Sequence, residues 1–367
     1  MGLFLYFCGM MPDISPIHNW LNSPKPLVVA GPCSAESEEQ LLATAKEISR
    51  LTNTKVFRAG IWKPRTRPNS FEGVGNKGLQ WLQRVKAETG MLTAVEVANS
   101  AHVEQALLHS VDVLWIGART VVNPFSIQEI AVALKGVHTV VMIKNPVSPD
   151  IEAWMGAIER VKKAGIDIII AVHRGFSSFV KTPCRNAPMW EIPIELKRRV
   201  PGLPILCDPS HITGKRELIA GISQKALDLE MDGLMIETHV HPEKALTDAR
   251  QQISPVQLKE LLDNLIIRKP SGNTEFETRL DLLRNEIDKL DSALIDIVGR
   301  RMEVVKEIGQ YKKENNITIL QIQRWRNIIN DWQARGGESS LDLEFLMRLL
   351  DEIHRESIRI QTQILEQ

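Results

Sequence analysis

Six cationic side chains follow short apolar runs of this 367-residue chain, and their type and spacing indicate chemistry. They are Arg58, Lys63, Arg65, Arg119, Lys144 and Arg174. The formal net charge is zero, so these cations do not belong to a generally basic surface. Cations gathered on a neutral protein indicate an anionic ligand, and a set of this size indicates more than one phosphate or carboxylate group.

The elements that must position these cations alternate between two patterns from residue 26 to about 266. Apolar, β-branched runs typical of strands occur at 27–30, 55–61, 92–97, 113–116, 139–143, 167–172, 204–207 and 233–236. Segments with helical spacing lie between them, such as 38–51, 79–88, 151–164 and 216–229. This alternation predicts a parallel sheet, and eight units in about 240 residues predict a (β/α)8 barrel, an α/β fold.

The ends of the predicted strands carry the reactive groups. In a (β/α)8 barrel the active site lies at the C-terminal ends of the strands. A polar or reactive side chain follows every run: Cys33, Arg58 with Lys63, Glu96, Arg119, Lys144, His173 with Arg174, Asp208 with His211, and Glu237 with His239. A purely structural barrel does not need such groups, so the pattern indicates one site at that end.

Composition restricts the class of protein. Hydrophobic residues make up 43% of the chain and charged residues 25%, as in ordinary globular proteins. A pI of about 7.1 argues against nucleic-acid binding. The four cysteines are too scattered for a disulfide framework, which indicates a reducing cytoplasm. Residues 1–20 are expected to form an N-terminal tail, because their apolar stretch lacks the basic region of a signal peptide and is too short to span a membrane.

Seven motifs in order carry a family resemblance. They are GPCSAE (31–36), KPRT (63–66), IGAR (116–119), IKNP (143–146), HRG (173–175), DPSH (208–211) and ETH (237–239) with ALTD (245–248). The set resembles the 3-deoxy-D-arabino-heptulosonate-7-phosphate (DAHP) synthase family in its compact type I-beta form. Residues 21–267 are expected to form this domain.

The resemblance implies a metal-dependent condensation of phosphoenolpyruvate with erythrose 4-phosphate. The implied metal ligands are Cys33, His211, Glu237 and Asp248, a mixture that suits Mn, Fe, Co or Zn rather than Ca or Mg, and we expect Mn. Phosphoenolpyruvate is expected against Arg58, Lys63, Arg119, Lys144 and Arg174, and the sugar phosphate against Arg65 and Thr66. Clustered cations such as Lys63 would stabilise developing charge. Glu96, Asp208 and His239 are candidates for positioning water or moving protons, and the alternative is that they are satisfied structural groups.

One departure and one sibling family bear on the choice of substrate. The residue after KPRT is usually Ser in this family, whereas here it is Arg67. The synthase that joins phosphoenolpyruvate to arabinose 5-phosphate shares the barrel and much of the phosphoenolpyruvate site. It lacks the KPRT run, which favours the erythrose 4-phosphate enzyme.

The chain changes character after the barrel. Residues 268–275 are polar with Pro and Gly and are expected to be a linker, and 276–367 are expected to be helical. Apolar positions spaced by four and three predict a first helix of about 40 residues, roughly 60 Å long. Two further helices are expected at 318–335 and 341–366, separated by Arg335-Gly336-Gly337. The long helix cannot bury its apolar seam within so small a unit, so we expect a homodimer.

Polar groups on these helices carry a second resemblance. Arg301 interrupts the seam, Lys312 shares its face, and Ser357 and Gln361 share a face of the last helix. The three-helix pattern resembles the all-helical chorismate mutase, which rearranges chorismate to prephenate. Substrate-binding positions of that family correspond to Arg284 (lent by a partner chain), Arg301, Lys312, Arg324, Ser357 and Gln361, with Lys312 and Gln361 at the ether oxygen. A family Glu is replaced by Trp325 and an Asp by Gln321.

The two resemblances together imply a bifunctional shikimate-pathway enzyme. Covalent fusion suggests that ligand binding in the helical domain regulates the barrel, with prephenate as the expected effector. The alternative is a monofunctional DAHP synthase whose helical domain only dimerises and senses a ligand.

Overall fold

The computed structural model describes residues 20, 26–63, 71–269, 271–338 and 340–366. The chain divides into two compact units, Met1–Arg268 and Lys269–Gln367, which are described separately. Arg65, Thr66, Arg67 and nearly all of the expected tail lie outside the described residues. Trp20, the last residue of that tail, packs against the apolar interior of the first unit.

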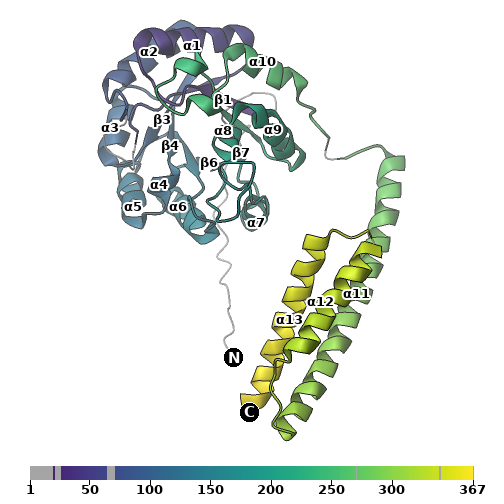
Figure 1. Cartoon of the computed structure of the whole chain (residues 1–367). Helices are drawn as coiled ribbons and strands as arrows, with labels where there is room; N and C mark the ends of the chain where they lie inside the picture. Colours follow the sequence, from purple (N-terminus) through teal and green to yellow (C-terminus); the bar gives the residue numbers. More distant parts are fainter. Residues whose placement is uncertain (1–19, 21–25, 64–70, 270, 339, 367) are drawn as a thin grey trace. The chain divides into compact units, whose positions relative to one another are not determined.

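The first unit is a closed barrel of parallel strands in the order β1-β2-β3-β4-β5-β6-β7-β8, which confirms the predicted fold (Figure 1). The strands are β1 Leu27–Gly31, β2 Val56–Arg58, β3 Leu92–Val97, β4 Val113–Ile116, β5 Val140–Lys144, β6 Ile168–His173, β7 Ile205–Cys207 and β8 Gly233–Glu237. Each coincides with an apolar run of the sequence, because parallel strands are buried on both faces.

Helices form the outer layer of the barrel. They are α1 Glu38–Leu51, α2 Lys77–Thr89, α3 Ser100–Leu108, α4 Ala118–Val121, α5 Pro124–Ala133, α6 Ile151–Lys163, α7 Glu191–Arg199, α8 Pro209–Thr213, α9 Ile219–Asp228 and α10 Pro255–Asn264. Short 3-10 turns lie at η2 Arg216–Leu218, η3 Pro242–Lys244 and η4 Ala249–Gln251. The helix expected over 216–229 was therefore wrong in its first turn, which is the 3-10 turn η2 before α9.

Two apolar clusters hold the barrel together. The inner one draws side chains from all eight strands, such as Val29, Trp115 and Val172, and fills the barrel interior. The outer one lies between the strands and the helices and includes Leu41 and Trp154. A packed interior leaves the strand ends as the place where polar groups can converge.

The second unit consists of α11 Thr274–Glu314, α12 Ile322–Glu338 and α13 Leu343–Glu366, and α13 packs against both other helices (Figure 1). The expected break at Arg335-Gly336-Gly337 was wrong, because α12 continues through both glycines. A Cβ atom at Gly336 would lie 2.3 Å from Leu346 Cδ2. The glycine therefore permits close packing of α12 on α13 and does not end the helix.

The apolar seam of α11 is largely open along its length. Leu290 is 64% exposed and Ile297 is 63% exposed, and Leu283, Ile287 and Leu294 are exposed as well. The three helices of one chain therefore leave this seam uncovered. No helix in the described part of the chain is both long and apolar enough to cross a membrane.

Candidate functional site

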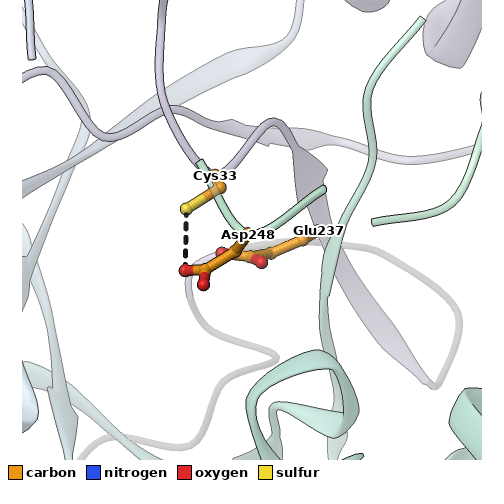
Figure 2. Close-up of side chains that lie close together, drawn as sticks. All are labelled: Cys33, Glu237 and Asp248. Atoms are coloured by element: carbon orange, nitrogen blue, oxygen red, sulfur yellow. Dashed lines mark hydrogen bonds between the residues drawn. The ribbon is translucent and has the colours of Figure 1, made fainter. Parts of the chain in front are cut away.

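Three potential metal ligands meet where β1 and β8 end side by side. The two strands pair at Gly31 and Glu237, so the Cys33 loop lies next to the end of β8. One ligand atom from each of Cys33, Glu237 and Asp248 lies within 4.8 Å of the others, and Cys33 Sγ lies 3.5 Å from Asp248 Oδ2 (Figure 2). A second contact joins the Cys33 loop to the loop that follows β8, since the Cys33 backbone N–H donates to Gln252 Oε1 at 2.9 Å.

His211, the fourth expected ligand, lies beside this cluster. Asp208 caps α8 by accepting from the His211 backbone N–H at 3.0 Å, and His211 Nδ1 lies 2.8 Å from Asp208 Oδ2. His211 Nε2 is 3.8 Å from Glu237 Oε1, so the ring faces one carboxylate of the cluster but is not part of its tight group. A thiol and two carboxylates with an imidazole alongside are a donor set that fits a divalent transition metal.

Burial controls the protonation of the Cys33 thiol. Burial, together with the neighbouring Glu237 carboxylate, raises the pKa of Cys33 to about 12, although the Lys63 cation acts to lower it. Lys63 Nζ lies 2.9 Å from the Cys33 carbonyl oxygen and 3.2 Å from Sγ. A bound divalent cation would stabilise the thiolate, as expected for a metal ligand.

The two carboxylates of the cluster remain ionised. Burial acts to raise the pKa of Glu237, but the neighbouring His211 and Arg58 outweigh it and lower the value. Burial likewise acts to raise the pKa of Asp248, and His211 with Arg185 lowers it overall. Both groups are therefore available as anionic ligands.

Arg58, at the end of β2, is the most deeply buried of the expected cations that the structure describes. It is 1% exposed, its Nη2 lies 3.3 Å from Glu237 Oε1, and its guanidinium carbon lies 4.9 Å from the centre of the Trp115 ring. Within the described residues its Nε and Nη1 have no hydrogen-bond partner. Unsatisfied buried donors on a cation are costly, so these two nitrogens indicate a place for an anion.

Lys144 and Arg174 extend the cationic region. Lys144 Nζ, at the end of β5, lies 2.7 Å from Asp208 Oδ2, and both side chains are buried. Burial acts to raise the pKa of Asp208, but His211 and Lys144 hold it well below its usual range. Burial lowers the pKa of Arg174 to about 10, and the Arg185 and Arg119 cations contribute to that shift. Arg119 itself is exposed. The electrostatic influence of Arg185 and Arg119 on Arg174 indicates that the three cations share one positively charged region.

Glu96 and His239 occupy different surroundings. Glu96 Oε1 lies 2.1 Å from where a Cβ of Gly117 would stand, so the carboxylate approaches this backbone only because the residue is glycine. Glu96, Lys63 and His102 line a cavity of about 230 Å³. His239 Nδ1 accepts from the His241 backbone N–H, and its Nε2 lies 3.7 Å from Glu36 Oε2.

Three residues that contact this site are not apparent from sequence. Arg185 Nη1 donates to Asp248 Oδ1 at 3.1 Å, Gln251 Nε2 donates to Glu237 Oε2 at 2.7 Å, and Trp115 lies against Arg58. Arg185 stands within the long β6–α7 loop and Gln251 within the loop after β8, so neither ends a strand. Trp115 lies within an apolar strand, so its residue type and position do not indicate a contact with the site.

The helical unit brings together part of the second predicted set. Arg301 Nη1 donates to Ser357 Oγ at 2.8 Å, and Gln361 Nε2 donates to the Ser357 carbonyl at 3.2 Å. Gln361 is buried, and its Oε1 has no partner among the described residues. Lys312 Nζ donates to the Ile319 carbonyl. Arg301, Ser357 and Gln361 therefore lie together between α11 and α13, whereas Lys312 contacts the segment that follows α11.

The other expected groups of this unit lie differently. Arg284 is exposed and pairs with Asp281 at 3.3 Å, and Arg324 is exposed. Trp325 stacks on His354 with ring centroids 3.6 Å apart. Burial lowers the pKa of His354, and the Arg301 cation contributes, so this stack lies near the Arg301 group.

The fold and the site define a class of protein: a (β/α)8-barrel enzyme that gathers cations beside a potential metal centre. The model of the DAHP synthetase I family matches residues 22–268, and that of chorismate mutase type II matches 283–362. The chain belongs to the DAHP synthetase I family and carries a chorismate mutase type II domain after the barrel. It is therefore an enzyme of aromatic biosynthesis with both catalytic domains.

Relatives of known structure or name cover the barrel. The phospho-2-dehydro-3-deoxyheptonate aldolase of Thermotoga maritima is 34% identical over 65% of this chain and 68% of its own. Its crystal structure matches with a TM-score of 0.58 at 32% identity over 65% of this chain and 67% of its own. The 2-dehydro-3-deoxyphosphooctonate aldolase of Geotalea daltonii is 30% identical over 70% of this chain and 97% of its own.

Proposed function

We propose that the barrel condenses phosphoenolpyruvate with erythrose 4-phosphate to DAHP and phosphate. The reaction uses a divalent metal ion, which we expect to be Mn²⁺, held by Cys33, His211, Glu237 and Asp248. One observation carries the proposal: the buried Arg58 has two N–H donors without a partner in the described structure, and its third nitrogen contacts Glu237 of the ligand cluster. An anionic substrate at Arg58 would therefore lie next to the metal.

The chain's own groups divide the work. Arg58, Lys63, Arg119, Lys144 and Arg174 hold the phosphate and carboxylate of phosphoenolpyruvate and stabilise the charge that develops as its enol carbon attacks the aldehyde. When bound, the metal supplies Lewis-acid polarisation of the aldehyde carbonyl.

The acid and base candidates differ in what they can contribute. Asp208 is an acceptor with a strongly lowered pKa, so its role is to hold Lys144 and His211 in place and not to carry a proton. Glu96 beside Lys63 is the better candidate for positioning the water that adds to the substrate, and His239 is a second candidate, with its Nε2 toward Glu36.

The choice of sugar phosphate rests on the KPRT motif. Arg65 and Thr66, the groups proposed for that phosphate, lie outside the described residues. Phosphoenolpyruvate consumption by the full-length protein, with either erythrose 4-phosphate or arabinose 5-phosphate, tests the assignment. Consumption with erythrose 4-phosphate that chelation abolishes and Mn²⁺ restores is expected. Consumption with arabinose 5-phosphate but not with erythrose 4-phosphate would contradict the substrate assignment. Activity that survives full chelation would contradict the metal centre.

For the helical domain we propose rearrangement of chorismate to prephenate. Arg301, with Arg324 and a partner chain's Arg284, would hold the two carboxylates. Lys312 and Gln361 would donate to the ether oxygen, where negative charge grows as the bond breaks. The protein needs no covalent chemistry, because it holds a compact substrate conformer. The uncovered seam of α11 supports a homodimer through this domain.

One observation favours the monofunctional alternative. Trp325 stands where the family has a Glu, and its stacking on His354 fills that position with rings instead of a carboxylate. The loss of chorismate absorbance measures mutase turnover and so distinguishes the bifunctional from the monofunctional protein. Arg301→Ala should abolish turnover by the full-length protein. If wild type has no turnover to lose, the domain only dimerises and senses a ligand.

Regulation by prephenate is part of the proposal. It is supported by the presence of both domains on one chain. Saturating prephenate should lower the DAHP synthase rate of wild type and have a weaker effect on Arg301→Ala. An unchanged rate in wild type would exclude prephenate as the effector.

The free cysteines Cys33, Cys184 and Cys207 support a cytoplasmic location.

A further inference from the structure

Two groups outside the expected ligand set connect the carboxylates of the candidate metal centre. Gln251 is 1% exposed, and its Nε2 donates to Glu237 Oε2 at 2.7 Å. Its Oε1 accepts from Arg185 Nη1 at 3.0 Å, and the same nitrogen donates to Asp248 Oδ1 at 3.1 Å. One amide and one guanidinium therefore join both carboxylates in a continuous hydrogen-bonded chain.

The chain of contacts engages one oxygen of each carboxylate and leaves the other oxygen to different neighbours. Arg185 engages Asp248 Oδ1, and the other oxygen, Oδ2, is the one 3.5 Å from Cys33 Sγ. Gln251 engages Glu237 Oε2, and the other oxygen, Oε1, lies 3.3 Å from Arg58 Nη2 and 3.8 Å from His211 Nε2. Each carboxylate thus has one oxygen held by Arg185 or Gln251. The other oxygen lies toward Cys33 in Asp248 and toward His211 and Arg58 in Glu237.

The backbone around these groups needs such support. Asp248 has a φ of 48°, in the left-handed region that a non-glycine residue adopts at a cost. The next glutamine, Gln252, is also buried and donates to the Thr247 carbonyl at 2.7 Å while accepting from the Cys33 N–H. The consecutive pair Gln251 and Gln252 therefore ties the segment after β8 to both the carboxylates and the Cys33 loop.

We propose that Gln251, together with Arg185, positions Glu237 and Asp248 for metal binding and so sets the affinity of the centre. The inference rests on the proposed metal centre. Glutamine suits the position because its side-chain amide donates to one partner and accepts from another, which neither a carboxylate nor an apolar side chain can do. Groups that orient metal ligands in this way typically change metal affinity by about 10–100-fold when they are replaced.

Co²⁺ binding by the full-length, metal-stripped protein tests the inference without using activity. Affinity is measured by competition with a chromophoric chelator, and the thiolate and d–d absorption bands report on the ligands. Gln251→Met keeps the side-chain volume and removes both hydrogen bonds, and it should weaken binding about 10–100-fold and alter the d–d bands. The matched control is Gln80→Met on the exposed face of α2, which should change neither.

Two further variants keep the outcomes distinct. If Gln251→Met does not fold, Gln251→Asn replaces it, since the amide is retained but is too short to reach both partners; it should weaken binding in the same sense. Unchanged affinity and spectrum in the folded variant would overturn the positioning role. Cys33→Ser reports on the centre itself: a wild-type thiolate band that this change removes supports the site. Absence of any such band in wild type would overturn the proposed metal centre, and the positioning role with it.

Discussion

Replacing Arg58 by methionine should separate substrate binding from metal binding, with effects of opposite sign. The change keeps an apolar stem near Trp115 and removes the guanidinium, whose Nε and Nη1 are buried and without partners in the described structure. A hydrogen bond to a charged group contributes about 1.5–3 kcal/mol, so two such bonds to phosphoenolpyruvate contribute about 3–6 kcal/mol. At 1.4 kcal/mol per tenfold, kcat/KM for phosphoenolpyruvate should fall by about 10²–10⁴.

The same change should strengthen metal binding and lower the stability of the metal-free protein. Arg58 lies 3.3 Å from the fully buried Glu237, and removing one partner of a buried ion pair costs about 3–5 kcal/mol. A bound divalent cation replaces the lost positive charge, so the fall in thermal stability should be larger without metal than with it. Removing a cation beside the ligand carboxylate should also raise metal affinity.

Steady-state kinetics at saturating erythrose 4-phosphate and metal titrations measure both effects. Arg50→Met, at an exposed arginine near the end of α1, is the matched control and should alter neither. A folded Arg58→Met variant that loses less than tenfold in kcat/KM would refute the reasoning, because the two free donors could not then face the substrate. Weaker metal binding in that variant would refute the electrostatic part.

Three further predictions concern other parts of the molecule. Burial lowers the pKa of His173 to about 3 from an ordinary value near 6.5, so the unfolded chain binds a proton there at a higher pH than the folded one. The stability contributed by the buried neutral imidazole is therefore complete above pH 6.5 and is lost as the pH falls toward 3. Between pH 6.5 and 5 the loss is about 2 kcal/mol, and His173→Phe should flatten the pH dependence of the barrel's unfolding in calorimetry; parallel curves for the two proteins would contradict this. Ser357→Ala removes the hydrogen bond that holds Arg301 and should lower mutase kcat/KM about tenfold with an unchanged synthase rate, whereas equal loss in both activities would point to misfolding. Leu290→Lys, on the open seam of α11, should convert a dimer to monomers in light scattering, and a persistent dimer would place the interface elsewhere.

Local pattern was sufficient for the elements of both units. The barrel strands are buried on both faces, so each is a continuous apolar run that the sequence displays directly. The repeat of four and three along α11 likewise predicts a long helix from neighbouring residues alone. Helix ends depend on tertiary packing as well: Gly336 resembles a break in sequence, yet Leu346 of α13 requires a residue without a side chain at that point.

The candidate site was predictable where its residues end strands. Because closure of a parallel barrel brings the C-terminal ends of all strands to one rim, the sequence alone is sufficient to group Cys33, Arg58 and Glu237. That argument depends only on strand order.

Loop conformation decided the remaining features of the site. Arg185 reaches Asp248 from a long loop, Gln251 bridges to Glu237 from another, and His211 lies beside the ligand cluster instead of within it. These contacts join segments far apart in the chain, and no periodicity or local propensity encodes where a loop will place a side chain. Sequence by itself therefore determined the strands, the long helix and the chemistry gathered at the rim, while tertiary packing decided which donors pair with which carboxylate and which apolar faces remain open.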